Sequence, residues 1–142
     1  MNKINFTDQS MENPHLLPPQ ALAYIGDAVY ELAVRRYLIA KGTVKVNQLH
    51  TQAVEYVRAG AQAEALLALE DVLTDEEKSV VRRGRNTKLL HIPKGAGVME
   101  YRYSTAFESL IGFLYLKGDI QRLNEILQLA GEVISGAGSK KA

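Results

Sequence analysis

The stretch QALAYIGDAVYELAVRRYL, at residues 20–38, decides the fold of this chain. Almost every position from 21 to 39 is apolar or small, and the run is too long for a strand. It therefore predicts a helix that is buried on most sides. Gly26 and Asp27 at its centre are both costly there, because a buried carboxylate needs a partner and a glycine inside a helix costs about 1 kcal/mol relative to alanine. This pair predicts a site where a second backbone approaches the helix closely.

A second mainly apolar stretch, YRYSTAFESLIGFLYL at residues 101–116, has the same features. Glu108 lies among large apolar residues, and Gly112 follows one turn later. We expect the two helices to cross and to bring a buried Asp27 and a buried Glu108 together. Two close carboxylates repel each other unless they share a proton or bind a cation, and oxygen ligands completed by water suit Mg²⁺ or Mn²⁺. Taken singly, each acid could instead be a salt-bridge partner or a helix cap.

The composition sets the broad class of the protein. A chain of 142 residues with 46% hydrophobic content fits one compact domain. The absence of cysteine excludes disulfides, thiolate zinc sites and cysteine nucleophiles. The N-terminus does not resemble a secretory signal, and no apolar run reaches the roughly 18 residues of a membrane span, so we expect a cytoplasmic protein with no membrane partner. The histidines form no ligand pattern, and the glycines form no fingerprint for a nucleotide cofactor.

The net charge of +1 hides an uneven distribution. Residues 55–77 hold seven acids against one base, whereas residues 78–102 hold seven bases against one acid. The second segment therefore carries seven positive charges minus one, which is +6. Such an excess is typical of a surface that binds a polyanion. The alternative is a solvated helix end whose bases complement the helix dipole, and charge alone favours neither.

The pattern of caps and breakers predicts an all-α helical bundle. We expect an N-terminal arm over residues 1–17, a helical domain over 18–134 and a flexible tail over 135–142. Pro19 suits the first turn of the first helix, which Lys41 and Gly42 end. Thr74 and Glu77 form a capping box that opens another helix. The remaining helices are expected from residue 46, over 61–69, over 101–116 and after residue 119.

Two motifs resemble a known family. YIGDAVYE at residues 24–31 resembles the signature helix of ribonuclease III, and TAFESLIGFLYL at 105–116 resembles that family's second catalytic helix. Residues 18–134 then look like a lone ribonuclease III domain. RRGRN at residues 82–86, followed by a loop and YRYSTAFE, is similar to the short bacterial members that lack a separate domain for binding double-stranded RNA. The order and spacing of the two motifs make the resemblance specific.

The resemblance implies a Mg²⁺-dependent endoribonuclease of double-stranded RNA, with Mn²⁺ as a substitute. In it, Asp27 and Glu108 hold the metal and carry catalysis. Three positions depart from the family's acidic pattern, which has glutamates four and seven residues before the aspartate and an aspartate three residues before the second glutamate. These positions are Ala23, Gln20 and Thr105. Fewer acids leave more of each metal shell to water and RNA phosphate.

The resemblance also implies a homodimer with one catalytic centre for each strand, and a role in maturing the large-subunit ribosomal RNA precursor. Both apolar helices carry more apolar side chains than one face of a small bundle can use, which also predicts an interface. Glu31 is interpreted as a partner of Arg35 rather than a metal ligand. The residues expected to grip RNA by its shape are Arg82, Arg83, Arg85, Asn86, Lys88 and Lys94.

Two other functions are compatible with parts of the pattern. The missing acids permit a module of the same fold that binds double-stranded RNA or the ribosome and has lost catalysis. A helical protein-interaction domain is a third interpretation. It leaves the +6 segment and the matched pair of acids unexplained.

Overall fold

The computed structural model describes residues 4–6, 11–87 and 97–141. Within these ranges every regular element is a helix and no strand occurs, so the predicted all-α class is confirmed. The elements are η1 (Pro14–Leu16), α1 (Pro19–Ala40), α2 (Val46–Val57), α3 (Ala59–Leu69), η2 (Glu70–Val72), α4 (Asp75–Arg85), α5 (Val98–Lys117) and α6 (Ile120–Lys141). None of the helices in the described ranges has the length and apolar character needed to cross a membrane.

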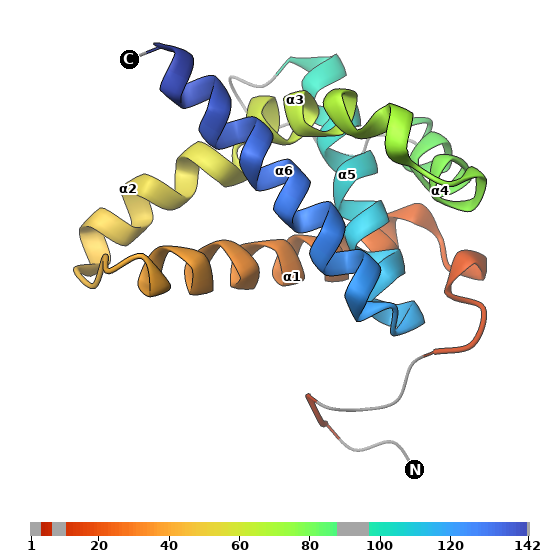
Figure 1. The fold of residues 1–142 in the computed structure, drawn as a ribbon. Coiled ribbons are helices and arrows are strands. Elements are labelled where there is room, and N and C mark those ends of the chain that lie inside the picture. The colour runs from red at the N-terminus through yellow and green to blue at the C-terminus, as the bar shows by residue number, and fades with distance from the viewer. Residues whose placement is uncertain (1–3, 7–10, 88–96, 142) are drawn as a thin grey trace.

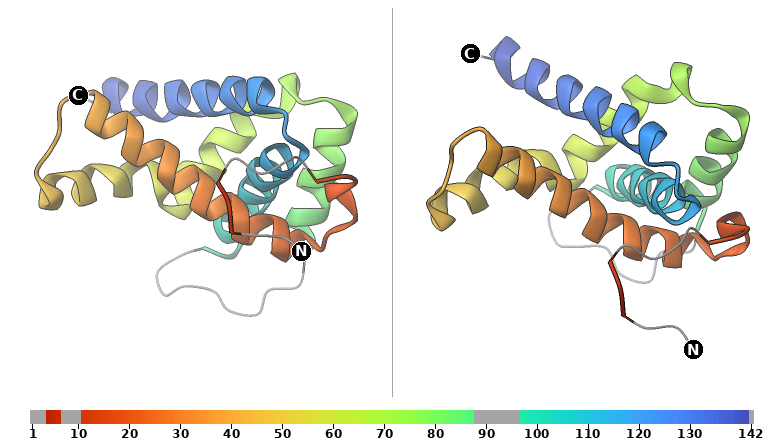
Figure 2. Two further views of the ribbon diagram at one scale, coloured as in Figure 1. Left: turned by 90° about the horizontal axis from the view of Figure 1, so that it is seen from below. Right: turned by 60° about the horizontal axis from the view of Figure 1, so that its bottom comes forward.

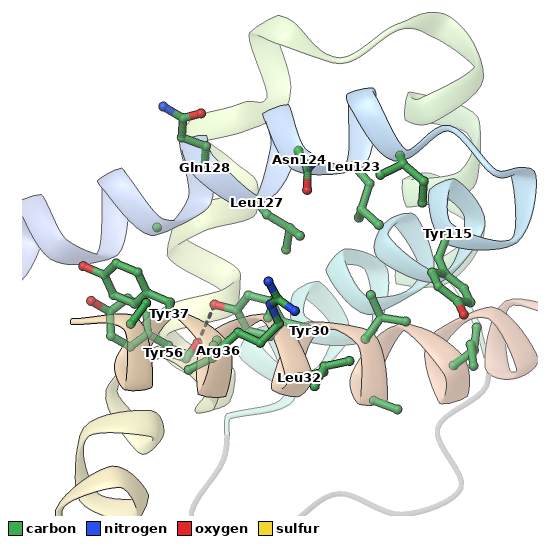
Figure 3. A pocket seen from close by; sticks show the side chains of 18 of the residues that line it. Tyr30, Leu32, Arg36, Tyr37, Tyr56, Tyr115, Leu123, Asn124, Leu127 and Gln128 are labelled. Carbon is green, nitrogen blue, oxygen red and sulfur yellow. Dashed lines mark hydrogen bonds between the residues drawn. The ribbon is translucent and has the colours of Figure 1, made fainter. Parts of the chain in front are cut away.

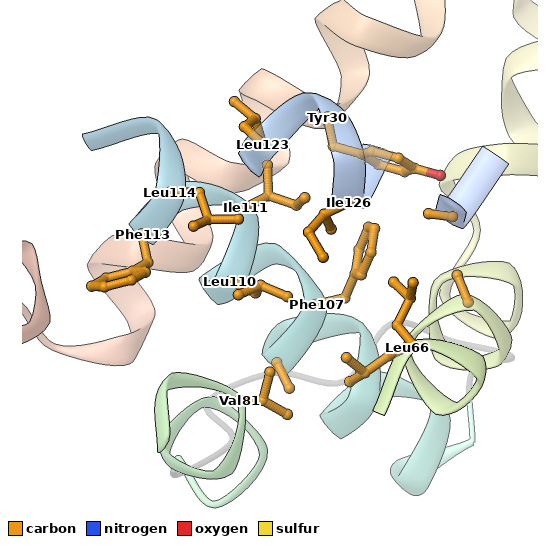
Figure 4. Packing of buried hydrophobic residues seen from close by; sticks show 14 of the residues in the cluster. Tyr30, Leu66, Val81, Phe107, Leu110, Ile111, Phe113, Leu114, Leu123 and Ile126 are labelled. Carbon is orange, nitrogen blue, oxygen red and sulfur yellow. The ribbon is translucent and has the colours of Figure 1, made fainter. Parts of the chain in front are cut away.

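Helix α5 is the centre of the bundle. Figures 1 and 2 show it enclosed by the other helices, and it contacts α1, α3, α4 and α6. Five of its large apolar side chains are fully buried and form part of the core shown in Figure 4: Phe107, Leu110, Ile111, Phe113 and Leu114. The prediction that this helix keeps an apolar surplus for an interface is therefore wrong for these five side chains, whereas Tyr115 and Leu116 near its end are half-buried. Four helices cover α5, so a single chain buries the five side chains of the core.

Helix α1 crosses α5 at two glycines. A Cβ atom on Gly26 would overlap the backbone carbonyl of Glu108, and one on Gly112 would overlap the carbonyl of Leu22. The hydroxyl of Ser109 donates a hydrogen bond to the carbonyl of Pro19 at 3.1 Å, in the same contact. The predicted close approach of two backbones at Gly26 is confirmed.

The burial of α1 differs from the prediction. One face of the helix packs in the core through Leu22, Tyr30, Val34 and Leu38. The opposite face is open, and Tyr24 is 84% exposed there. A helix that lies at the edge of the bundle has neighbours on one side only, so its long apolar composition did not produce burial on most sides.

Helix α4 begins with the predicted capping box and is tied to α6. The Thr74 hydroxyl accepts from the Glu77 backbone N–H at 3.1 Å, and the Glu77 carboxylate accepts from the Thr74 N–H at 2.9 Å. The Arg122 guanidinium donates two further hydrogen bonds to Glu77, each at 2.8 Å. Burial alone would raise the pKa of Glu77, but the hydrogen bonds from Arg122 and Thr74 outweigh it and lower the pKa.

Residues near both ends of the chain are hydrogen-bonded to the helical bundle. The Met11 N–H donates to the Leu116 carbonyl at 2.7 Å, which attaches the predicted arm to the end of α5. At the other end, α6 continues through Lys141, where the sequence predicts a tail from residue 135. The hydroxyls of Ser135 and Tyr56 are hydrogen-bonded at 3.0 Å, so the beginning of this extension is held against α2.

Candidate active site

The crossing of α1 on α5 brings Asp27 and Glu108 together, as predicted. Gly26 touches the backbone of Glu108, and the adjacent Asp27 carboxyl lies within hydrogen-bond reach of the Glu108 carboxyl. The burial of the two acids was predicted wrongly. Asp27 is exposed and Glu108 is partly buried, because Asp27 projects from the rim of the crossing and not from the buried face of α1.

The Glu108 carboxyl binds its proton unusually tightly. Burial, and then the negative charge of Asp27, raise the pKa of Glu108 to about 8, and Glu31 adds a weaker repulsion. A hydrogen bond from Gln62 acts in the opposite direction and lowers this pKa. In the metal-free protein at neutral pH, Glu108 therefore keeps a proton that a bound divalent cation would displace.

Two further side chains lie around Glu108. The Gln62 side chain of α3 donates from Nε2 to Glu108 Oε2 at 3.3 Å. The Tyr30 hydroxyl donates to the Tyr56 carbonyl at 2.9 Å, and its ring packs edge-on against Phe107 with 5.1 Å between centroids. Burial, then Tyr56 and Glu108, raise the pKa of Tyr30. Sequence reasoning missed Gln62, although a lone amide among buried alanines of α3 was a usable signal.

Two of the positions that depart from the family's acidic pattern, Ala23 and Thr105, supply no carboxylate to the site. Ala23 is buried, and the hydroxyl of Thr105 donates to the Tyr101 carbonyl at 3.0 Å. In the part of the chain that the structure describes, no three acids or histidines gather into a metal-binding group. Two carboxylates still fit Mg²⁺, because this ion usually keeps several waters and takes only one or two protein carboxylates.

The predicted role of Glu31 agrees with the structure. Arg35 Nη2 lies 4.0 Å from Glu31 Oε2, one helical turn away on the exposed side of α1. This distance is at the limit of an ion pair, and such exposed pairs contribute about 0–1 kcal/mol. Glu31 is thus close enough to repel Glu108 weakly while its nearest base is Arg35.

Some of the predicted RNA-binding residues are exposed, and others contact the rest of the protein. Arg82 and Asn86 are exposed at the end of α4. The Arg83 guanidinium donates instead to the carbonyls of His15 and Leu17, at 2.7 and 3.0 Å, and so holds the arm. Arg85 lies over the ring of Tyr103, with 6.0 Å between its Cζ and the ring centroid.

Another arginine of the basic segment also serves the fold. Arg102 donates to the Arg85 carbonyl at 3.1 Å and joins α5 to the end of α4. Lys88 and Lys94 lie outside the described residues. Helix α4 has acids in its first turn and bases in its last turn, which is the arrangement that its dipole favours. Part of the +6 charge is therefore structural, and part is exposed.

Comparison with known proteins identifies the family. The model of the ribonuclease III domain matches residues 20–119, which include both crossing helices and the two acids. The chain therefore belongs to the ribonuclease III family, and it is an endoribonuclease that acts on double-stranded RNA. Enzymes of this family generally depend on a divalent metal ion.

The individual relatives belong to one group of this family. The chain is 52% identical over 124 residues to Mini-ribonuclease 3 of Symbiobacterium thermophilum, and the aligned region covers 87% of this chain and 95% of that protein. It is 49% identical to Mini-ribonuclease 3 of Brevibacillus brevis, over 91% of this chain and 96% of that one. A crystal structure of a Fusobacterium nucleatum protein superposes with a TM-score of 0.76 at 28% identity, covering 89% and 99% of the two chains. The predicted similarity to short bacterial ribonuclease III proteins is confirmed.

We predict that the metal-free protein loses stability as the pH rises from about 4.5 to about 8. In this range the unfolded chain has released the Glu108 proton while the folded chain retains it, so the folded state binds more protons and the free energy of unfolding falls with pH. Each tenfold difference in proton affinity corresponds to about 1.4 kcal/mol. Urea unfolding in EDTA across this range should show the decline, and Glu108→Gln should flatten it.

The matched measurement adds a divalent cation at pH 8. It should raise the melting temperature of the wild-type protein and leave that of Glu108→Gln nearly unchanged. Equal pH slopes for the two proteins in EDTA would contradict the assignment of the titrating group to Glu108.

Proposed function

We propose that Asp27 and Glu108 hold a Mg²⁺ ion, which Mn²⁺ can replace, at the catalytic centre of this endoribonuclease. The observation that carries the proposal is the convergence of these two acids at the Gly26–Gly112 crossing, where no ion pair with a base is found for Asp27 or Glu108 among the described residues. A bound cation would relieve their repulsion and release the Glu108 proton. When bound, the ion supplies an activated water and neutralises charge on the scissile phosphate.

The exposed polar and basic side chains at the end of α4 are proposed to grip the duplex. Arg82 and Asn86 are exposed, and Arg85 is partly so. Together with Lys88 and Lys94 they would contact phosphates and 2′-hydroxyls, which are read by shape rather than sequence. Arg83 is excluded from the main contacts because two backbone carbonyls already take its guanidinium.

A homodimer is proposed on the open face of α1. A groove of about 1020 Å³ lies between α1 and α6, with Leu123 and Leu127 of α6 facing Leu32 and Arg36 of α1 (Figure 3). Its lining is mostly apolar, and other apolar side chains of α1 are exposed, including Tyr24 and Ile39. An exposed apolar surface of this kind usually marks an interface, and closed two-fold pairing is the commonest arrangement.

Pairing through α1 would also join two catalytic centres, because Asp27 lies on this same helix. Each centre would then cut one strand of a bound duplex. We propose the large-subunit ribosomal RNA precursor as the natural substrate and the cytoplasm as the location. The similarity to the Mini-ribonuclease 3 proteins supports this proposal.

Asp27→Asn and Glu108→Gln are each predicted to abolish cleavage of duplex RNA while the fold and the duplex affinity are retained. Both changes keep the side-chain volume and remove a charged metal ligand. Glu31→Gln is the matched control, and a much smaller effect is expected because its nearest partner is Arg35. The measurement is cleavage of a ribosomal RNA precursor duplex and of an unrelated duplex, with Mg²⁺, with Mn²⁺ and in EDTA.

Near-normal turnover by either acid variant would remove that residue from the metal site. If the wild-type protein bound duplex RNA but cut nothing with either metal, the binding-module interpretation would replace the catalytic one.

Arg82→Ala combined with Asn86→Ala should weaken duplex binding for all sequences and flatten its dependence on salt concentration, because phosphate contacts release counterions. Arg83→Ala is the control from the same helix. It should lower the melting temperature by releasing the arm, and change the RNA affinity much less. Affinity titrations at several salt concentrations, beside melting curves, test both. The reverse ranking of the two variants would contradict the division of the basic segment.

Leu32→Glu is predicted to convert the dimer into a monomer, since it places a charge at the apolar groove. Leu67→Glu, on the exposed side of α3 and outside the groove, is the matched control and should leave the dimer intact. Sedimentation at micromolar concentration distinguishes the states. A wild-type monomer that still made paired cuts on opposite strands would contradict the dimer while leaving the metal site standing.

A further inference from the structure

Gln62 is a buried polar side chain whose position is not explained by packing. It is 2% exposed, and its neighbours along α3 on the core side are Ala61, Ala63 and Ala65. A carboxamide in such surroundings is costly unless its hydrogen-bonding groups are all satisfied. An apolar residue of similar length would avoid that cost, so the presence of an amide needs a reason.

The amide nitrogen of Gln62 is fully used. Nε2 carries two hydrogens and has two acceptors, the Val57 carbonyl at 2.9 Å and Glu108 Oε2 at 3.3 Å. A reversed amide would place its carbonyl oxygen against both of these oxygens. The hydrogen-bond pattern therefore determines the orientation of the group, with the nitrogen toward Glu108.

The amide oxygen of Gln62 is left without a partner. Among the described residues, Gln62 Oε1 is a buried side-chain atom for which no hydrogen bond exists. The other buried polar side chains, such as Thr105 and Ser109, donate to backbone carbonyls of their own helix. An unsatisfied buried polar group costs about 1–3 kcal/mol, and a catalytic role is one of the explanations for retaining such a group.

We infer that Gln62 is the positioning residue of Glu108. Its Nε2 holds Oε2 of the carboxylate, and the Val57 carbonyl at the end of α2 holds Nε2 in turn, so the carboxylate cannot rotate away from Asp27. Partners of this kind orient metal ligands, and their removal typically reduces metal affinity or activity about 10- to 100-fold. This inference rests on the proposed metal site at Asp27 and Glu108. The competing explanation is that Gln62 only fastens α3 to α2 through Val57.

The test compares Gln62→Met, which keeps the length of the side chain and removes the amide, with Gln121→Met on the exposed surface of α6. In Gln62→Met we expect the Mg²⁺ concentration for half-maximal cleavage to rise about tenfold or more. Mn²⁺ affinity measured by electron paramagnetic resonance without RNA should fall by a similar factor. Duplex affinity measured in Ca²⁺ should be unchanged, and Gln121→Met should match the wild-type protein throughout.

A purely structural role gives a different result. If the role of Gln62 is purely structural, Gln62→Met has a lower melting temperature, but the folded variant keeps the Mn²⁺ affinity and the Mg²⁺ dependence of the wild-type protein. That result would overturn the inference. If Gln62→Met does not fold, the wild-type protein is used. The assigned side-chain amide resonances of Gln62 should shift when Mg²⁺ is added, and should not shift in Glu108→Gln. Absence of the wild-type shift would overturn the inference as well.

Failure of the inference is distinguishable from failure of the metal site. An inactive Asp27→Asn beside a fully active Gln62→Met with normal Mg²⁺ dependence rejects only the positioning role. A fully active Asp27→Asn rejects the metal site itself.

Discussion

The contact between the backbones of α1 and α5 is the constraint on which the rest of this structure depends. Gly26 and Gly112 each face a carbonyl of the other helix so closely that no side chain fits. Because the helices meet at backbone distance, short side chains at the crossing can reach each other, and the carboxyls of Asp27 and Glu108 do so. The same contact sets α5 in the middle of the bundle, where the remaining helices pack around it.

A carboxyl group at the edge of a hydrophobic core reduces stability when it is ionised. Glu108 stands next to Phe107 and one turn from Ile111, both fully buried, and its raised pKa measures how poorly these surroundings solvate a negative charge. In the part of the chain that the structure describes, no base forms an ion pair with Glu108. The chain supplies one amide hydrogen bond from Gln62 and leaves the charge to be balanced by something that binds, which is the usual condition of a metal site.

Arginine has two uses in this domain. Arg83, Arg102 and Arg122 donate to backbone carbonyls and join segments that are distant in the sequence. Arg82 stays exposed in the same helix as Arg83. A planar guanidinium with several donors can bind backbone carbonyls as well as phosphate. The number of arginines in a segment therefore exceeds the number that are free to bind RNA. The apolar surface of α1 is divided similarly, between the core on one side and the open groove on the other.

The sequence alone determined what depends on neighbours along the chain. The limits of α1, the beginnings of α2 and α4 and the capping box at Thr74 were predictable because caps and helix breakers act locally. The meeting of Asp27 with Glu108 was predictable because a glycine beside an acid in an apolar helix has few structural explanations. The tertiary structure decided which faces are covered. The packing of the helices on one another explains why Asp27 is exposed, why α5 is enclosed and why Arg83 holds the arm. It also explains why the amide of Gln62 lies beside Glu108. Such packing sums many weak contacts between distant residues, and no local pattern in the sequence records that sum.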